Sequence, residues 1–446
     1  MNRLVGTIAF LLFVTKHAQA AYGSYGNYNS TTTTTTPSTV TPYQNTSVTL
    51  QAPLNDFALR LYKLILEDPS IAAQNFFYSP TSIVSALMLV YAGAKGDTKN
   101  EMTTALGLQD QVSQGVDVLA SFQSILNVFR PGPVINGSAA YDLSLANRAY
   151  IEQTFDVLAS YIRTIKTSLN STLGLADFIN KAEGARSEIN QWVSQQTNSK
   201  ITELLPQGSV NEFTRLVLVN AIYFKAAWAD EFDERLTSKR PFTNLDGSTN
   251  QVDMMSKFKA TMLYLDRAGE MGCALGVPAF QMVSIPYKSN ELSLLIFLPR
   301  DASADGLRNF QQSIFSGFPD RFLSEARNRT IDSLILPKFT ITTTLQPKDA
   351  LQRNIFSGIF QLFNPDTADL TGISAVKPLF VSDIIHQAFI EVNERGTEAA
   401  AATSVLGSAT SFNPDPVNFV ADHPFIFVIR DERSGLVIFM GRVTKL

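Results

Sequence analysis

The stretch "FTRLVLVNAIYFKAAW", residues 213–228, decides the fold class of this 446-residue chain. β-branched and aromatic residues occupy both sets of alternate positions along it. Because side chains alternate between the two faces of a strand, this pattern predicts a strand that is buried on both sides. A sheet covered on both faces needs helices packed against it. The stretch therefore predicts a mixed α+β fold.

Other segments predict the elements around that strand. Strand-like runs follow at "MVSIPY" (282–287), "LSLLIFLP" (292–299), "SLILPKFTI" (333–341) and "AFIEVNE" (388–394), and "PFIFVIRD" (424–431) and "GLVIFMGRV" (435–443) predict a terminal hairpin. Residues 55–66 predict a helix behind an Asn55 cap. A second predicted helix has Ser79 as its N-cap, Pro80 in its first turn and its end at Gly93. Another is predicted to start at Asp97 or Thr98, with Glu101 placed for a capping box.

Composition and charge narrow the possible classes of protein. The chain is 45% hydrophobic and 17% charged, which is typical of a globular protein. No linker-like or highly charged segment divides residues 54–446, so we expect one domain with a large sheet covered by several helices. A formal net charge of -4 disfavours nucleic acid as a partner.

The N-terminal residues predict secretion. Residues 1–20 carry Arg3, an apolar run and small residues at Ala18 and Ala20, which is the pattern of a signal peptide. The apolar run is too short for a membrane anchor, and no later stretch is apolar enough to span a bilayer, so we expect an extracellular protein without membrane contact. Residues 21–53 are rich in Thr, Ser and Pro and predict a flexible arm, either a spacer or an O-glycosylated stalk.

The sequence contains five candidate glycosylation motifs and one cysteine. The Asn-x-Ser/Thr motifs begin at Asn29, Asn45, Asn136, Asn170 and Asn328. The single cysteine, Cys273, excludes an internal disulfide, and we interpret it as a buried, unreactive thiol.

No arrangement of residues predicts an enzyme. The predicted mature chain has two histidines, His386 and His423, and neither has a sequence context that places it beside a nucleophile. No Cys/His cluster has zinc spacing, and no nucleotide-binding loop is present in the sequence. We therefore expect no catalytic residues, no metal and no cofactor.

The stretch "NERGTEAAAATSVLGSATSFNPDP", residues 393–416, has an unusual run of small side chains. As a strand it would place Thr397, Ala399, Ala401 and Thr403 on one face, and Glu398, Ala400, Ala402 and Ser404 on the other. The first face is small and uncharged, which suits entry between two strands of an existing sheet. A helix remains the alternative because alanine has a high helix propensity, although Gly407, Pro414 and Pro416 are typical of an exposed loop.

At these residues the chain resembles the serpins, a family of serine protease inhibitors, over 55–446. The motifs that carry the resemblance include "NFFYSPTSIVSALMLVYAGAKGDT" (75–98), "INQWVSQQTNSKI" (189–201), "LVNAIYFKAAW" (218–228), "VSDIIHQAFIEVNERGTEAAAAT" (381–403) and "ADHPFIFVIRDERSGLVIFMGRV" (421–443). The resemblance implies three β-sheets, about nine helices and an exposed reactive loop from about Gly396 to Asn418. It also implies that a serine protease cleaves this loop and becomes trapped as an acyl-enzyme while the loop inserts into the main sheet.

The resemblance assigns roles to individual residues. Glu394, Gly396, Thr397, Glu398, Ala399, Ala400, Ala401, Ala402 and Thr403 match the hinge of inhibitory members. Ser79, Ser82, Asn220 and His386 match the polar cluster where the main sheet opens, and Trp228 matches the residue near the point of loop entry. The alternative is a noninhibitory member that acts as a carrier, chaperone or binding protein.

The resemblance also suggests the cleaved bond and the target. Counting seventeen residues from Glu394 places the bond at Thr410-Ser411, and Phe412-Asn413 and Leu406-Gly407 are alternatives. No Lys or Arg occurs between Gly396 and Ile429, so an elastase-like or chymotrypsin-like target is favoured over a trypsin-like one. A basic heparin-binding helix is not apparent, and we expect a monomer.

Overall fold

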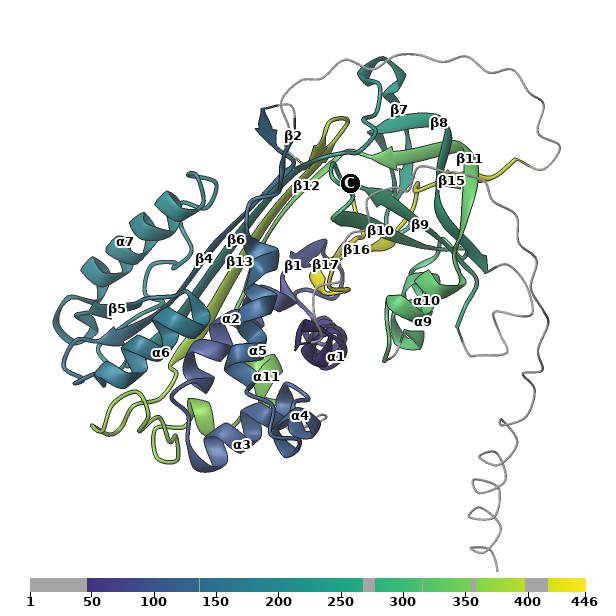
Figure 1. Ribbon diagram of the computed structural model, residues 1–446. Coiled ribbons are helices and arrows are strands. Elements are labelled where there is room, and N and C mark those ends of the chain that lie inside the picture. The colour runs from purple at the N-terminus through teal and green to yellow at the C-terminus, as the bar shows by residue number, and fades with distance from the viewer. Residues whose placement is uncertain (1–45, 136, 268–276, 315, 354–357, 398–415) are drawn as a thin grey trace, which may run out of the picture. The chain divides into compact units, whose positions relative to one another are not determined.

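The computed structural model describes residues 46–135, 137–267, 277–314, 316–353, 358–397 and 416–446 (Figure 1). These residues form three β-sheets and ten α-helices, which confirms the predicted α+β fold. The helices are α1 (Thr46–Leu66), α2 (Pro80–Tyr91), α3 (Gly96–Ala105), α4 (Gln109–Ser113), α5 (Val118–Ile125), α6 (Ala159–Leu169), α7 (Phe178–Gln196), α9 (Ala304–Ser313), α10 (Asp320–Glu325) and α11 (Lys348–Gln352). Short 3-10 helices are η1 (Leu126–Phe129), η2 (Glu234–Leu236) and η4 (Gln361–Phe363).

The six-stranded sheet carries the candidate site. Its strands, in spatial order, are β12 (Phe339–Leu345), β13 (Asp383–Asn393), β14 (Gly396–Thr397), β6 (Leu216–Ala227), β4 (Tyr141–Glu152) and β5 (Leu173–Ala176). β6 also pairs directly with β13, in parallel, over Val217–Tyr223. The short β14 therefore occupies only one end of the space between these two strands.

β6 buries both of its faces, as its sequence predicts. Leu218, Ile222 and Phe224 belong to the main hydrophobic core, on the face where α2 packs. The alternate residues Val217 and Val219 belong to a second, smaller core that includes residues of α7. In Figure 1, α7 and α2 lie on opposite sides of the sheet. The alternation of apolar residues therefore connects one strand to two separate cores.

The nine-stranded sheet holds the chain that follows the predicted reactive loop, whereas the segment before the loop belongs to the six-stranded sheet. Its main path is β1 (Phe76–Tyr78), β17 (Val437–Val443), β16 (Phe425–Asp431), β10 (Leu292–Pro299), β9 (Phe280–Pro286), β8 (Thr249–Arg267), β11 (Arg327–Pro337) and β15 (Asn418–Val420), and β7 (Ser238–Thr243) pairs with β8. The predicted terminal hairpin is confirmed as β16 and β17. A two-stranded hairpin, β2 (Val134–Ile135) and β3 (Ser138–Ala139), completes the set.

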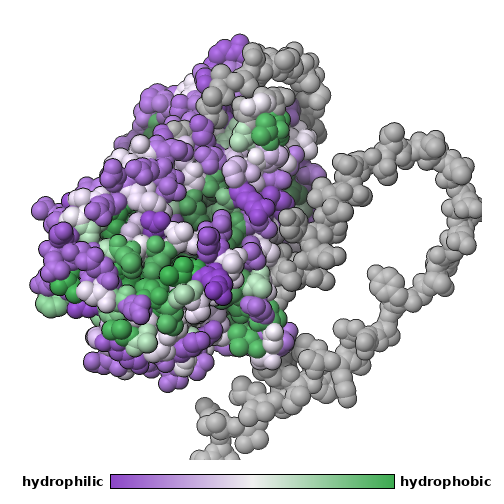
Figure 2. Space-filling model, turned by 60° about the vertical axis from the view of Figure 1, so that its left-hand side comes forward, coloured by the Kyte–Doolittle hydropathy of each residue, from purple (hydrophilic) through white to green (hydrophobic). Residues whose placement is uncertain are grey.

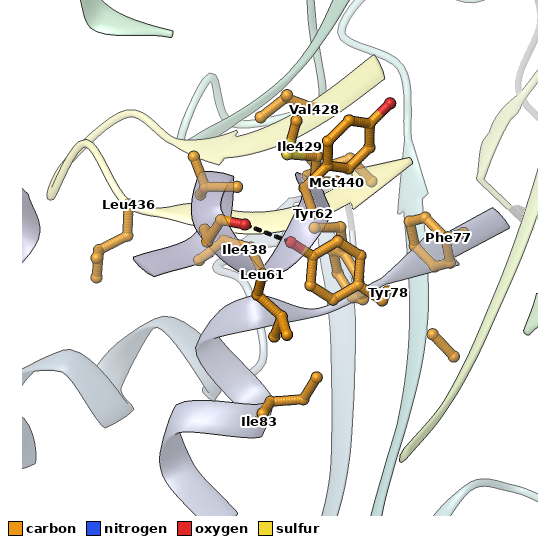
Figure 3. Packing of buried hydrophobic residues seen from close by; sticks show 14 of the residues in the cluster. Leu61, Tyr62, Phe77, Tyr78, Ile83, Val428, Ile429, Leu436, Ile438 and Met440 are labelled. Atoms are coloured by element: carbon orange, nitrogen blue, oxygen red, sulfur yellow. Dashed lines mark hydrogen bonds between the residues drawn. The ribbon is translucent and has the colours of Figure 1, made fainter. Parts of the chain in front are cut away.

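The main core lies where α1, α2, β1 and the β16–β17 hairpin meet. Figure 3 shows Tyr62, Phe77, Ile83 and Met440, from α1, β1, α2 and β17, packed together. All four side chains are fully or almost fully buried. Segments that lie more than 300 residues apart in the chain therefore share one core, which makes the fold dependent on long-range contacts.

Three predicted element boundaries were wrong. The helix predicted at 55–66 begins at Thr46, so the predicted arm over 21–53 overlaps α1, in which Leu50 is fully buried. The run at 333–341 forms two strands, β11 and β12, which belong to different sheets and are separated by Lys338. Neither Asp97 nor Thr98 is an N-cap, because Gly96 is already helical.

The helix α7 is attached to the six-stranded sheet by a buried carboxylate. Glu152, the last residue of β4, has no exposed surface. Its side chain accepts hydrogen bonds from the backbone amides of Phe178 (2.8 Å) and Ile179 (3.2 Å), in the first turn of α7. A carboxylate is favourable there because the first amides of a helix have no partner within the helix.

Figure 2 shows the face that carries α6, β5 and α7. Hydrophobic residues gather in the lower part of this face, and hydrophilic residues dominate the upper part.

Within the described residues, no helix combines the length and the apolar character that a membrane crossing requires.

Candidate functional site

The hinge predicted at Glu394 folds back into the six-stranded sheet. After β13 the chain turns at Glu394 and Arg395, and β14 then runs antiparallel to both of its neighbours. Thr397 lies opposite Val392 of β13 and Ala226 of β6. β13 and β6 are therefore already separated at this end, while they pair with each other further along.

The backbone at Gly396 requires a glycine. Its φ is +141°, a region that residues with a side chain rarely adopt. A Cβ atom on Gly396 would also lie 2.1 Å from the carbonyl oxygen of Ala226. Both observations explain why a glycine stands where the hinge enters the sheet.

Thr397 points into the core. It has no exposed surface, and its hydroxyl lies 3.0 Å from the hydroxyl of Tyr287. The face that the sequence analysis described as small and uncharged therefore begins with a residue that contacts the interior of the sheet. A charged residue here would lose its hydration without gaining a partner of opposite charge.

Two ion pairs hold the turn before β14. The Glu394 carboxylate pairs with Lys338 at 2.9 Å and accepts a hydrogen bond from the Thr237 hydroxyl at 2.7 Å. Burial opposes ionisation of Glu394, but these bonds outweigh it and lower its pKa. The next residue, Arg395, pairs with Glu234 at 3.0 Å.

Trp228 also contacts the turn between β13 and β14. Its indole Nε1 donates to the carbonyl of Asn393 at 2.9 Å, and its backbone amide donates to the carbonyl of Arg395 at 3.0 Å. The ring stacks on Tyr287 with centroids 4.6 Å apart. The side chains that contact residues 393–397 thus come from both large sheets.

Ser79, Ser82, Asn220 and His386 lie together under the six-stranded sheet, and we call them the sheet-opening cluster. All four are fully buried. His386 and Asn220 are directly paired residues of β13 and β6, and the His386 Nδ1 donates to the Asn220 side-chain oxygen at 2.5 Å. Asn220 also donates to the carbonyl of Ser82 and accepts from its hydroxyl. The His386–Asn220 bond joins the two strands at a point where they pair directly, and the Asn220–Ser82 bonds join β6 to α2.

The protonation state of His386 follows from this geometry. Its Nε2 accepts a hydrogen bond from the backbone amide of Ser79 at 3.1 Å. With one ring nitrogen donating and the other accepting, the imidazole is neutral. Burial lowers the pKa of His386 to about 3. The ring therefore stays uncharged at neutral pH.

The cluster extends to two residues that the sequence analysis missed. The Ser85 hydroxyl donates to the carbonyl of Ser82 at 2.7 Å, and the Asn147 side chain donates to the Ser85 hydroxyl at 3.0 Å. Asn147 also lies opposite Asn220 in the register of β4 and β6. Trp228, by contrast, directly follows the last residue of β6, eight residues beyond Asn220 and about 26 Å away.

Several predicted site residues lie outside the described part of the chain. They are Glu398, Ala399, Ala400, Ala401, Ala402 and Thr403 of the hinge, the candidate reactive residues Leu406, Thr410, Ser411 and Phe412, the glycosylation candidates Asn29, Asn45 and Asn136, and Cys273. Among the described candidates, Asn170 ends α6 and Asn328 lies at the start of β11, and both are exposed.

Among the described residues, the rings of His386 and His423 are hydrogen-bonded to backbone groups, an amide side chain and a carboxylate rather than to a nucleophile. The hydroxyl of Ser79 donates to the carbonyl of Ile438 rather than to His386. The His423 ring nitrogens lie 2.8 Å from the Asp422 carboxylate and 2.7 Å from the carbonyl of Pro299. In the part of the chain that the structure covers, no group of three or more His, Cys, Asp or Glu side chains could hold a metal ion.

Comparison with known proteins identifies the family. The family model described as "Serpin (serine protease inhibitor)" matches residues 52–446. The chain is 37% identical over 390 residues to leukocyte elastase inhibitor A of Rattus norvegicus, covering 87% of this chain and 97% of the relative. It is also 37% identical over 399 residues to Serpin B9 of Homo sapiens, covering 89% and 99%. The structure superposes on uncleaved ovalbumin with a TM-score of 0.74 at 28% identity, covering 89% of this chain and 100% of ovalbumin. The chain therefore belongs to the serpins, a family of protease inhibitors rather than enzymes.

Proposed function

We propose that this protein inhibits a serine protease as a suicide substrate, by insertion of its cleaved reactive loop into the six-stranded sheet. The observation that carries the proposal is the position of β14 between β13 and β6. The sheet is open at the end where the loop begins, and the first inserted side chain, Thr397, is uncharged and buried. Insertion would continue an arrangement that is present in the uncleaved chain.

The register of β14 predicts where later residues would lie. β14 is antiparallel to both neighbours, so each further residue would move one position back along β13 and β6. Six residues after Thr397, Thr403 would lie opposite both His386 and Asn220. These two residues are hydrogen-bonded to each other before insertion. The hydroxyl of Thr403 would supply a replacement donor and acceptor at the sheet-opening cluster.

The same register sets the length of loop that insertion requires. The direct pairing of β13 and β6 spans Asp383–Phe389 and Val217–Tyr223. Leu406 would lie opposite Asp383 and Val217, at the far end of this paired region. All three candidate bonds lie at or after Leu406, so cleavage at any of them would leave enough chain to separate the two strands completely.

Insertion is energetically reasonable because it increases strand pairing. The inserted segment would form antiparallel ladders on both sides, in place of one parallel pairing of seven residue pairs. Strand addition of this kind is a recognised form of molecular recognition and switching, and serpin loop insertion is an example of it. The energy that drives the trap would come from these new backbone hydrogen bonds and from burial of the small side chains.

We further propose that the target is elastase-like or chymotrypsin-like and that the protein is secreted. The absence of Lys and Arg between Gly396 and Ile429, and the names of the relatives that inhibit leukocyte elastase, support the first proposal. The pattern of residues 1–20, together with the exposure of Asn170 and Asn328, supports the second. If the protein is secreted, the culture medium should contain a mature chain that begins near Ala21.

Incubation with a panel of serine proteases tests the proposed function. The wild-type protein should form a covalent complex that survives denaturing electrophoresis, and mass spectrometry of the released fragment should identify the cleaved bond. The variant Thr397→Arg should mostly be cleaved without trapping, because burial of an unpaired guanidinium costs several kcal/mol. Thr397→Val is the matched control, since it keeps the shape and lacks charge. Cleavage of the wild type without any covalent complex would instead indicate a noninhibitory carrier or binding protein.

A further inference from the structure

An exposed aromatic residue lies beside the C-terminal anchor of the reactive loop. Among the described residues, three phenylalanines are strongly exposed: Phe213 (69%), Phe258 (52%) and Phe360 (42%). Phe258 is in β8, directly opposite Ser333 of β11, and Ser333 is opposite Asn418 of β15. Asn418 begins the strand that follows the loop. The strands β8, β11 and β15 lie side by side in Figure 1.

The register places the ring of Phe258 on the same face as Asn418. Residues directly opposite each other on adjacent strands point to the same side of a sheet. Two strand spacings separate Phe258 from Asn418, a distance of about 10 Å. Asn418 is exposed and Ser333 is half-buried, so the ring is flanked by polar groups on this face. An apolar ring with a polar surround is the usual composition of an energetically important contact.

The backbone next to Phe258 is tied to the loop anchor. Lys259 has φ +57°, a conformation that costs a residue with a side chain about 1 kcal/mol or more. Its ammonium group pairs with the carboxylate of Asp332. Asp332 accepts a hydrogen bond from the backbone amide of Val417 at 2.9 Å and donates its own amide to the carbonyl of Val417 at 2.7 Å. Asp332 thus holds both Val417, which follows the loop, and Lys259, at the bend beside Phe258.

A protease bound to the loop would cover this face. From Thr410, the seven residues to Val417 reach at most about 25 Å. A globular domain of about 200 residues has a radius of gyration of about 16 Å. A sphere with that radius of gyration is about 40 Å across, which exceeds the reach of the loop, so a protease bound at the cleaved bond can extend over the surface next to Val417 and Asn418. Phe258 lies within that area.

We propose that Phe258 is the centre of a second contact surface for the target protease, with Ser333 and Asn418 beside it on the same face. This inference rests on the proposed function, because the occupant is the protease held by the reactive loop. The ring would pack against an apolar area of the protease before cleavage and increase the rate of association. It would have no part in loop insertion, since β8 belongs to the other large sheet.

Kinetic comparison of three variants tests the proposal. The change Phe258→Ala should lower the association rate with chymotrypsin or pancreatic elastase about tenfold, which corresponds to about 1.4 kcal/mol. The stoichiometry of inhibition should stay unchanged, because insertion is unaffected. Phe258→Tyr should react within twofold of wild type, since it keeps the ring. Phe213→Ala is the matched control, because Phe213 precedes β6 at the end opposite Ala227, about 40 Å from the hinge.

Each outcome separates this inference from the proposed function. If Phe258→Ala reacts within twofold of wild type, or no more slowly than Phe213→Ala, the second contact surface is refuted and the inhibitor proposal stands. If the wild type is cleaved without trapping, the inhibitor proposal fails, and the rates of loop cleavage in the same variants still decide the role of Phe258. A wild-type protein that no protease in the panel cleaves or binds would refute both.

Discussion

His386 shows how one buried side chain can set both a hydrogen-bond network and a pH response. Its ring accepts from Ser79 and donates to Asn220, so it links α2, β6 and β13 only in the neutral form. A protonated ring would need a second acceptor in place of the Ser79 amide, which can only donate. The sheet-opening cluster is therefore sensitive to the charge of a single residue.

The stability of the protein should fall on acidification through His386. Its pKa is lowered from 6.5 to about 3 in the folded state. Between these values the unfolded chain binds a proton that the folded chain does not, so the stabilising contribution is complete above pH 6.5 and decreases as the pH falls toward 3. The free energy of unfolding should lose up to about 1.4 kcal/mol per pH unit from this group.

Urea unfolding at a series of pH values measures this contribution. His386→Gln serves as the comparison, because it removes the titrating group while its amide can still donate and accept hydrogen bonds. The difference in unfolding free energy between wild type and variant should change with pH between 6.5 and 3, and stay constant above pH 7.5. A difference that is constant over the whole range would contradict the assigned protonation state.

At the scale of elements, the sequence predicted those whose signal is local. β6, β10 and the β16–β17 hairpin were predicted because continuous apolar runs bounded by turn residues need no information from elsewhere in the chain. The division of residues 333–341 at Lys338 was not predicted. Both halves have strand character, and only tertiary contacts assign them to different sheets. The start of α1 was not predicted because Pro53 and the polar residues near it interrupt the apolar pattern that connects the buried Leu50 to the rest of the helix.

The same distinction applies to the candidate site. Motif matching found Ser79, Ser82, Asn220 and His386, and the structure brings them into contact. Ser85 and Asn147 were missed because neither has a distinctive sequence context. They join the cluster only through the helical spacing of α2 and the register between β4 and β6. Strand register is a property of the folded sheet, so no local pattern could have supplied it.

The attachment of α7 through Glu152 gives a prediction at this scale. Glu152→Ala would leave the buried amide of Phe178 and the part-buried amide of Ile179 without this acceptor and would create a small cavity. Each unpaired buried amide costs about 1–3 kcal/mol, so the free energy of unfolding should fall by roughly 2–4 kcal/mol. Glu152→Gln should lose less, because its amide oxygen can still accept.

Hydrogen exchange identifies where that energy is lost. The amides of residues 178–182 should exchange faster in Glu152→Ala than in wild type, while those of β16 and β17 should change little. An equal acceleration throughout the domain would indicate a general loss of packing rather than detachment of α7.

At the scale of the whole molecule, β13 and β6 are the two strands that the proposed insertion would separate. They pair directly over seven residue pairs and are held apart at one end by β14. If the cleaved loop inserts between these strands, as we propose, the inserted sheet is the more stable arrangement because it adds strand pairing on both sides. Cutting the loop should therefore strengthen the molecule, whereas a cut in an ordinary loop leaves stability unchanged or lowers it.

Thermal unfolding of the cleaved protein tests this expectation. Limited proteolysis within residues 404–413 should raise the midpoint of unfolding by roughly 5 °C or more, because several kcal/mol of new pairing are added and about 1 kcal/mol shifts the midpoint of a domain this large by about 1 °C. Cleaved Thr397→Arg should show a much smaller increase, since its charged side chain opposes insertion. Equal midpoints for intact and cleaved wild type would show that the uncleaved sheet stores no energy.

The stacking of Trp228 on Tyr287 has a practical consequence. The chain has only two tryptophans, and the other, Trp192, lies in α7 beside Tyr150. The intrinsic fluorescence therefore comes from one indole at the hinge and one on the helix that covers the sheet. In a Trp192→Phe background, a stopped-flow emission trace would follow the hinge alone in real time, without an attached dye.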